Sequence, residues 1–204
     1  MNLTCISVLL GFVALLQACA SAPVSKSVEN APSNAIYQQH LQRIAAIQQF
    51  SIKGRIGVQA DGKGFSGRLT WQHDNVSDDI ALYSPLGGQI ASIKRTVEKV
   101  TLEDAKGNSI SAADAEMLTQ TALGWRLPLT GLADWSLGRP ARNTAQASVW
   151  DAQGHLISLK QDGWDIEYQN YSAQNGYFLP NKILLKSEGV TLKLLVEQWD
   201  NLNN

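Results

Sequence analysis

Apolar and polar residues alternate with a period of two along much of the chain. The alternation is clearest over residues 52–59, 65–72, 164–169 and 190–197. Turn sequences such as Asp61-Gly62 separate these runs. This pattern is typical of antiparallel strands with one buried face and one face in solvent. The sequence therefore predicts a mainly β (α+β) protein with about ten or eleven short strands.

A helix is expected before the first strand. Asn34 is placed to cap it, and helical spacing puts Tyr37, Leu41, Ile44 and Gln48 on one face. All but Gln48 of these four are apolar. We therefore expect this helix to pack on the folded domain.

Two further helices are expected in the middle of the chain. Residues 111–114 (Ser-Ala-Ala-Asp) resemble a capping box with Asp in place of Glu, which predicts a helix running to about Leu123. A second short helix over residues 129–137 places Leu132 and Trp135 on one side. A sheet with one apolar face must close on itself or be covered. We therefore expect a strongly curved antiparallel sheet or barrel with a helical cover, and periodicity leaves open whether its interior is packed or hollow.

The N-terminal segment has the features of an export signal. Residues 5–16 are apolar and uncharged, but a membrane-spanning helix needs about 20 such residues. The apolar run ends in the sequence Leu16-Gln17-Ala18-Cys19, which is similar to a bacterial lipobox. This similarity predicts acylation of Cys19 after removal of residues 1–18. The alternative is an ordinary secreted protein with a free cysteine.

A mature chain starting at Cys19 would have two parts. Residues 19–33 are rich in Ala, Ser and Pro and are expected to form a flexible tether, while residues 34–204 form the folded domain. Cys5 leaves with the signal, so no disulfide can form within the mature chain. Residue 20 is not the Asp that keeps bacterial lipoproteins at the inner membrane, so the resemblance to lipoproteins implies the outer membrane.

Composition and motifs argue against nucleic acid binding and catalysis. Lys plus Arg (17) nearly balance Asp plus Glu (18), whereas binding to phosphate backbones needs a clustered cationic excess. His40, His73 and His155 are far apart in the sequence and are expected to be solvated or hydrogen-bonded. The carboxylates at 78–79 and 103–104 lie beside turn residues, where we expect them in solvent. We expect neither an enzyme nor a cofactor.

Two segments have more apolar surface than their positions require. Residues 82–88 form a loop with Leu86 at the tip, which favours contact with lipid or a partner; the alternative is a leucine folded back on the sheet. Residues 123–140 hold two Trp and five Leu. This insertion is either part of a packed core or a lid over an apolar pocket.

The order and spacing of several motifs resemble the LolB family, the outer-membrane receptors of bacterial lipoprotein sorting. The matching motifs are the lipobox, Gly54-Arg55-Ile56, Leu69-Thr70-Trp71-Gln72, Ser84-Pro85-Leu86-Gly87, Asp114-Ala115-Glu116, and Gly124-Trp125-Arg126-Leu127-Pro128-Leu129 followed by Leu132, Trp135 and Leu137-Gly138.

The resemblance implies an unclosed antiparallel β-barrel with a helical lid over an apolar cavity. It implies that Leu86 protrudes and enters the membrane, and that Trp71, Trp135, Trp164 and Leu132 line the acyl-binding cavity. The implied partners are a LolA-like periplasmic carrier chaperone, lipidated client proteins and outer-membrane lipids, and the protein is expected to be a monomer facing the periplasm. The alternatives are a soluble chaperone of the same fold, which would lack the lipobox, and a structural or envelope-assembly lipoprotein with a packed core.

Overall fold

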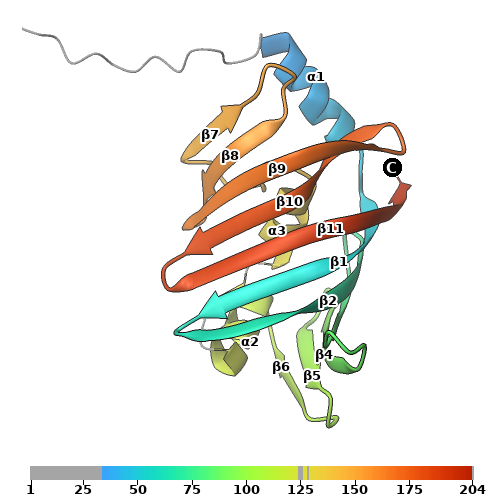
Figure 1. The fold of residues 1–204 in the computed structure, drawn as a ribbon, viewed down its shortest axis with the longest axis vertical. Helices are drawn as coiled ribbons and strands as arrows, with labels where there is room; N and C mark the ends of the chain where they lie inside the picture. Colours follow the sequence, from blue (N-terminus) through green and yellow to red (C-terminus); the bar gives the residue numbers. More distant parts are fainter. Residues whose placement is uncertain (1–33, 124–125, 128, 204) are drawn as a thin grey trace, which may run out of the picture.

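A computed structural model describes residues 34–123, 126–127 and 129–203. In these residues, eleven antiparallel strands form one sheet in the order β6-β5-β4-β3-β2-β1-β11-β10-β9-β8-β7 (Figure 1). The strands are β1 (Gln49–Ala60), β2 (Lys63–His73), β3 (Asp78–Tyr83), β4 (Gln89–Arg95), β5 (Val100–Asp104), β6 (Ser109–Ala112), β7 (Ala147–Trp150), β8 (Leu156–Gln161), β9 (Trp164–Gln174), β10 (Tyr177–Ser187) and β11 (Val190–Asn203). The expected mainly β fold with about ten or eleven strands is confirmed.

The sheet formed by the described residues does not close into a barrel, because its edge strands β6 and β7 do not pair. Every neighbouring pair is consecutive in the chain except β1 and β11, which pair at the centre of the sheet. The strands β6 and β7 are consecutive in the sequence but lie at opposite edges. The segment between them must therefore run from one edge of the sheet to the other.

The alternating pattern places its apolar residues on the concave face. In β1 and β2, Ile52, Leu69 and Trp71 are buried. Gly54 on β1 allows the backbone of the neighbouring strand to approach closely. A Cβ at Gly54 would lie 2.1 Å from the carbonyl oxygen of Leu195, and the register of β1 with β11 shifts between Lys53 and Gly54. A larger residue at Gly54 would push these two central strands apart.

The first helix, α1 (Asn34–Ala45), forms as expected, although Gln48 falls beyond its end. It packs against the hairpin of β7 and β8, where the rings of His40 and His155 lie 5.0 Å apart. A Cβ at Gly154 in this hairpin would lie 3.1 Å from the backbone of Tyr37, so only a glycine lets the helix come this close. Burial is the main reason that the pKa of His40 is lowered to about 4, and the neighbouring His155 adds to the effect. The docked helix thus holds His40 neutral.

The second helix, α2 (Ala115–Leu123), starts later than the sequence suggested. The expected capping box at residues 111–114 is wrong, because Ser111 belongs to β6, where its Oγ lies 2.8 Å from Thr101 Oγ1. Asp114 itself caps the helix and accepts a hydrogen bond from the Met117 amide at 2.7 Å. A capping residue is thus present, but it is Asp114 rather than Ser111.

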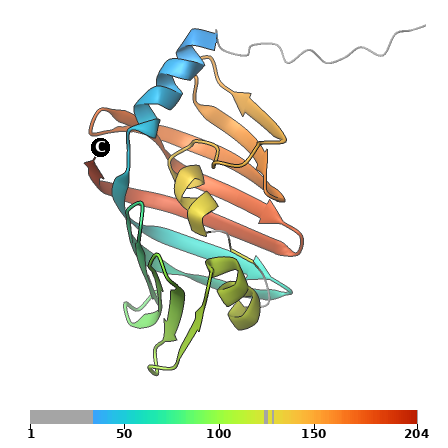
Figure 2. The ribbon, with the colours of Figure 1, turned by 180° about the vertical axis from the view of Figure 1, so that it is seen from behind.

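The third helix, α3 (Leu129–Ser136), confirms the expected short helix and lies across the concave face of the sheet (Figure 2). Its end is marked by Gly138, whose φ of +75° is costly for residues with a side chain. The buried core of the described residues extends from Ile44 to Trp199 in the sequence. No helix in these residues has both the length and the hydropathy needed to cross a membrane.

Candidate functional site

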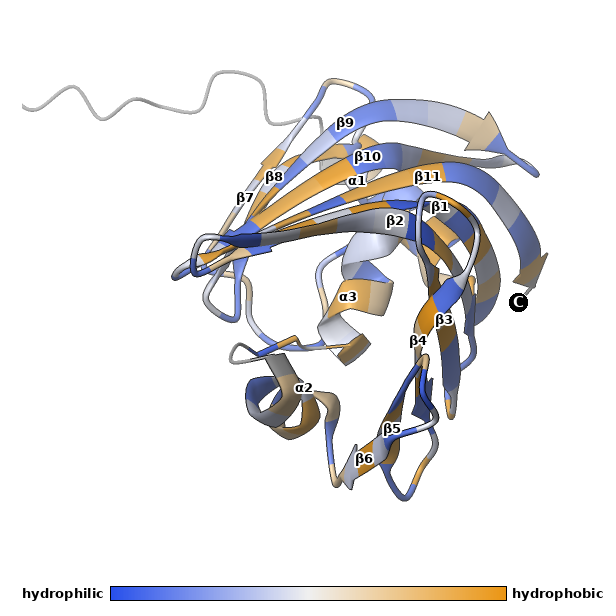
Figure 3. Ribbon diagram, turned by 60° about the horizontal axis from the view of Figure 1, so that its bottom comes forward, coloured by the Kyte–Doolittle hydropathy of each residue, from blue (hydrophilic) through white to orange (hydrophobic). Residues whose placement is uncertain are grey.

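The helix α3 lies within the concavity of the curved sheet, and part of its ribbon has the colour of hydrophobic residues (Figure 3). Leu129, Leu132 and Trp135 are buried, and Trp135 is 0% exposed. The ring of Trp135 lies 6.4 Å from that of Trp164 on β9. The leucine contacts and the contact between the two indole rings are apolar and non-directional, and they stabilise the position of α3 by burial.

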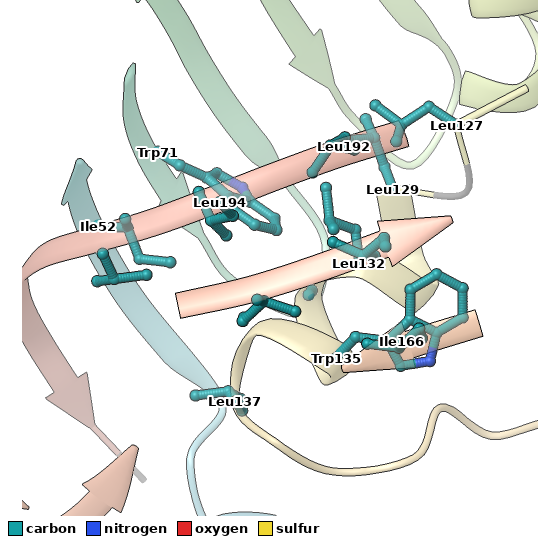
Figure 4. Packing of buried hydrophobic residues seen from close by; sticks show 14 of the residues in the cluster. Ile52, Trp71, Leu127, Leu129, Leu132, Trp135, Leu137, Ile166, Leu192 and Leu194 are labelled. Carbon is teal, nitrogen blue, oxygen red and sulfur yellow. The ribbon is translucent and has the colours of Figure 1, made fainter. Parts of the chain in front are cut away.

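The residues predicted to line an acyl-binding cavity all belong to one hydrophobic cluster: Trp71, Leu132, Trp135 and Trp164. Figure 4 shows Trp71 on the sheet, and Leu132 and Trp135 on α3, within this packed cluster. Trp164 also borders an open hollow beside α3. The structure thus brings the four residues together, three of them in the packed interior and Trp164 at its border.

The hollow has a volume of about 1390 Å³ and lies between the C-terminal end of α1, α2, α3 and the turns that follow β8 and β10. Its apolar wall includes Leu41, Ala133, Trp164 and Val190. Its other lining residues are mostly polar or charged, including arginines and carboxylates. A hollow lined by both apolar and polar side chains suits an amphiphile with an apolar part and a hydrated head.

A buried glutamine attaches α3 to the sheet. Gln161, the last residue of β8, is 0% exposed. Its Oε1 accepts hydrogen bonds from Trp135 Nε1 and from the Ala141 amide, each at 2.8 Å. Its Nε2 donates to the carbonyl oxygens of Ala141 and Asn143. One side chain therefore holds both α3 and the segment that leaves it.

Arg139 makes a second attachment, between α3 and α1. Its Nε donates to Asp134 Oδ1 at 2.7 Å. Its Nη1 donates to the carbonyl oxygens of Ile44 and Ile47. The guanidinium thus satisfies backbone acceptors at the C-terminal end of α1, where a positive charge also interacts favourably with the helix dipole.

Asp78 is the centre of a buried polar cluster, so the expectation that it is solvated is wrong. It is 2% exposed, and it accepts hydrogen bonds from Trp71 Nε1 at 2.8 Å and from Arg95 Nε. Its Oδ1 also lies 2.7 Å from His73 Nδ1. Asp104, by contrast, stays at an exposed turn, where the Asn108 side chain and backbone amides lower the pKa of its carboxyl. The buried Asp78 fixes the indole of Trp71 in the sheet.

The loop between β3 and β4 presents Leu86 to solvent. Leu86 is 99% exposed, which rules out the alternative that it folds back on the sheet. The Ser84 amide donates to the Gly88 carbonyl at 2.8 Å, and the Gly87 amide donates to the Ser84 carbonyl at 2.9 Å. Gly87 has a φ of +96°. The tight turn therefore has its own hydrogen bonds and does not need the Leu86 side chain for packing.

The described part of the chain contains no cluster of three or more His, Cys, Asp or Glu side chains suited to hold a metal ion. His155 lies 3.0 Å from Asp151 Oδ2 and stacks on Tyr171 with ring centroids 4.8 Å apart. Its contacts, like those of His73, are thus with neighbouring side chains. Cys19, with the rest of residues 1–33, lies outside the described residues.

Comparison with known proteins identifies the family. The sequence pattern of the family described as "Outer membrane lipoprotein LolB" matches residues 48–199. The outer-membrane lipoprotein LolB of Pseudomonas fluorescens (strain Pf-5) is 35% identical, over 94% of this chain and 94% of the relative. The chain belongs to the LolB family. The LolB of Pseudomonas paraeruginosa is 33% identical, over 92% of this chain and 91% of the relative.

A solved structure supports the fold alone. A DUF1329 family protein from Desulfovibrio piger covers 85% of this chain and 93% of its own chain, with a TM-score of 0.50 and 9% identity. Membership of the LolB family makes the protein a lipid-anchored outer-membrane lipoprotein with a role in lipoprotein localisation, and the family is not one of enzymes.

The sequence reading missed Gln161, Arg139 and the burial of Asp78. A signal for Gln161 was present, because Leu159 and Gln161 are alternate residues on the same face of a strand. A polar residue at an inward position needs buried hydrogen-bond partners. A partner of Arg139, Ile44, is 95 residues away in the chain. The partners of Asp78 lie on the neighbouring strands β2 and β4, and its burial follows from the pairing of these strands with β3.

We predict that Gln161→Leu destabilises the fold by about 3 kcal/mol, because the Trp135 indole N–H and the Ala141 amide lose their buried acceptor. Urea unfolding followed by circular dichroism measures the change. The control is Gln169→Leu, an exposed glutamine on β9, for which the change should stay within about 0.5 kcal/mol. Equal stabilities of the two variants would show that the Gln161 cluster does not hold α3.

Proposed function

We propose that the protein accepts lipidated proteins from a soluble periplasmic carrier, binds their acyl chains beside α3 and releases them into the outer membrane. The observation that carries this proposal is the pairing of a large hollow beside α3, whose lining is partly apolar, with a loop whose Leu86 is 99% exposed. The hollow of about 1390 Å³ is larger than the roughly 300–1,000 Å³ of small-ligand pockets. Membership of the LolB family supports the same direction of transfer.

Acyl chains would enter from the hollow and extend between α3 and the sheet. Trp164 is the entry residue in this proposal, because it borders the hollow and contacts Trp135. Leu132 and Trp71 lie deeper and would become accessible as α3 moves away from the sheet. An acyl chain gains about 0.8 kcal/mol per buried CH₂, so a few methylenes offset the lost burial of one leucine.

The complete burial of Trp135 favours a second candidate, a structural lipoprotein with a permanently packed core. In that case α3 would be a fixed part of the core, and the hollow would be a hydrated surface feature. The two candidates differ in whether apolar ligands reach Trp164 and the residues behind it.

We predict that a fatty acid brominated along its chain quenches the tryptophan fluorescence of the anchor-free chain, defined as residues 20–204 after an initiator Met. This chain retains the whole described core. Trp164→Phe should remove a clear part of the quenching, whereas Trp150→Phe should not, because Trp150 packs on Tyr37 outside the hollow. An unchanged spectrum at saturating ligand would favour the structural lipoprotein.

Leu86 is the proposed membrane contact, and Leu86→Glu tests it. Burial of a leucine is favourable by about 1.5–3 kcal/mol, whereas a carboxylate resists entry into the apolar layer. We expect Leu86→Glu to fold normally and to accept cargo from the carrier, but to release it into liposomes at least tenfold more slowly. The measurement is a two-step transfer assay with carrier, receptor and liposomes.

Val97→Glu provides the matched control, because Val97 is an 80% exposed apolar residue in the loop between β4 and β5. It should release cargo at the wild-type rate. Normal release by Leu86→Glu, or equal slowing by both variants, would refute a specific role of Leu86.

Cys19 is the proposed site of the lipid anchor, with residues 1–18 removed and residues 19–33 as the tether. One acyl chain binds membranes only marginally, whereas two or more hold a protein stably. We predict that the full-length protein stays in the membrane fraction after salt and carbonate washes and that its first residue is an acylated Cys19 by mass spectrometry. The anchor-free chain should remain in the aqueous fraction. An unmodified Cys19 in the mature protein would contradict this assignment.

A further inference from the structure

A small cleft on the convex face of the sheet adjoins the loop that carries Leu86. Its volume is about 470 Å³, and it lies between β1, β2, β11 and the loop after β3. Lys53, Arg68, Tyr83, Gly87 and Glu197 are among its lining residues. The cleft is separate from the hollow beside α3, with which it shares no lining residue.

The charges at this cleft do not balance. Arg55 and Arg68 are directly opposite each other in the register of β1 and β2. Arg55 Nε donates to Glu197 Oε1 at 2.6 Å, and Lys53 Nζ lies 3.9 Å from Asp200 Oδ2. Among the described residues, Arg68 has no ion-pair partner. Like charges opposite each other destabilise a sheet, so folding stability does not account for Arg68.

The unpaired guanidinium lies against the loop. Leu69 and Trp71 are buried on the concave side, so Arg68 projects from the convex side of β2. A Cβ at Gly87 would lie 3.1 Å from Arg68 Nη2. The glycine thus leaves room for the guanidinium one residue away from Leu86. An anion held by Arg68 would lie immediately beside the exposed leucine.

We propose that Arg68 binds the phosphate of a phospholipid headgroup while Leu86 enters the apolar layer beneath it. The proposal rests on the membrane contact of Leu86 proposed above. A guanidinium presents parallel N–H donors that match the oxygens of a phosphate, and it remains charged at any physiological pH. Phosphates form the layer next to the hydrocarbon region, which is where a side chain adjoining an inserted leucine is placed. The pair would orient the protein on the membrane with the loop inward.

The test compares binding to two membranes without net charge, only one of which contains phosphate. The anchor-free chain is sedimented with vesicles of phosphatidylcholine or of digalactosyldiacylglycerol, which has no phosphate. We expect the wild-type chain to bind phosphatidylcholine about five- to tenfold more tightly, as for a hydrogen-bonded charged group. Arg68→Gln should remove this preference and leave galactolipid binding unchanged. Thermal unfolding should show that Arg68→Gln is at least as stable as the wild-type chain, because the variant no longer has a like charge opposite Arg55.

Lys193→Gln is the control for general charge, because Lys193 is an exposed cation on β11 away from the cleft. It should keep the preference for phosphatidylcholine. Full retention of the preference by Arg68→Gln, or its equal loss in Lys193→Gln, would overturn the phosphate site.

Leu86→Glu separates this proposal from the one on which it rests. It should weaken binding to both kinds of vesicle, because it removes the apolar contact. Undiminished binding of Leu86→Glu to both would refute membrane insertion of Leu86. Weakened binding of Leu86→Glu together with an unchanged preference in Arg68→Gln would refute only the role of Arg68.

Discussion

The concave face of the sheet is apolar along the central strands, and a sheet whose edges do not meet cannot bury such a face alone. In this fold the two edge strands, β6 and β7, are joined by residues 113–146. The connection has to run between opposite edges, and it carries α3 across the concave face. The strand order thus supplies the cover that the open barrel requires.

The cover is held by two kinds of interaction with different properties. Leu132 contributes apolar burial without a directional requirement, which an acyl chain could replace, whereas Trp135 combines burial with a hydrogen bond from its indole N–H. Gln161 and Arg139 make directional hydrogen bonds near the C-terminal end of α3. Under the proposed function, the C-terminal end of α3 would stay fixed to the sheet, while α2 and the N-terminal part of α3 would move. An acyl chain would then replace apolar contacts between α3 and the sheet, and the helix would remain attached to the sheet.

The strands and two of the helices followed from local patterns, because alternation and helical spacing record which face of an element is buried. Ile52, Trp71 and Trp164 are apolar positions of the alternating runs, and all three are buried. The start of α2 was missed because Ser111 and Asp114 both suit a helix cap, and only the pairing of β5 with β6 decides between them. Gln161 and Asp78 depend on partners from other elements, so their roles arise from the tertiary fold. The distinction between a hollow and a packed interior likewise depends on how α3 lies on the sheet.

Release of cargo at the proposed site requires only small differences in free energy. A tenfold change in affinity corresponds to about 1.4 kcal/mol, which is less than the burial of two methylenes. A receptor that exposes somewhat less apolar surface to the acyl chain than a bilayer does would therefore lose its cargo to that bilayer. The exposed Leu86 contributes nothing to the packed core, and Arg68 faces a like charge across the strand pair. Both features are unfavourable or neutral for folding, and under the proposals made above both would become favourable when the loop meets a phospholipid surface. Under these proposals, the convex face beside the β3–β4 loop would contact the membrane, and the concave side would hold the acyl chain that is to enter it.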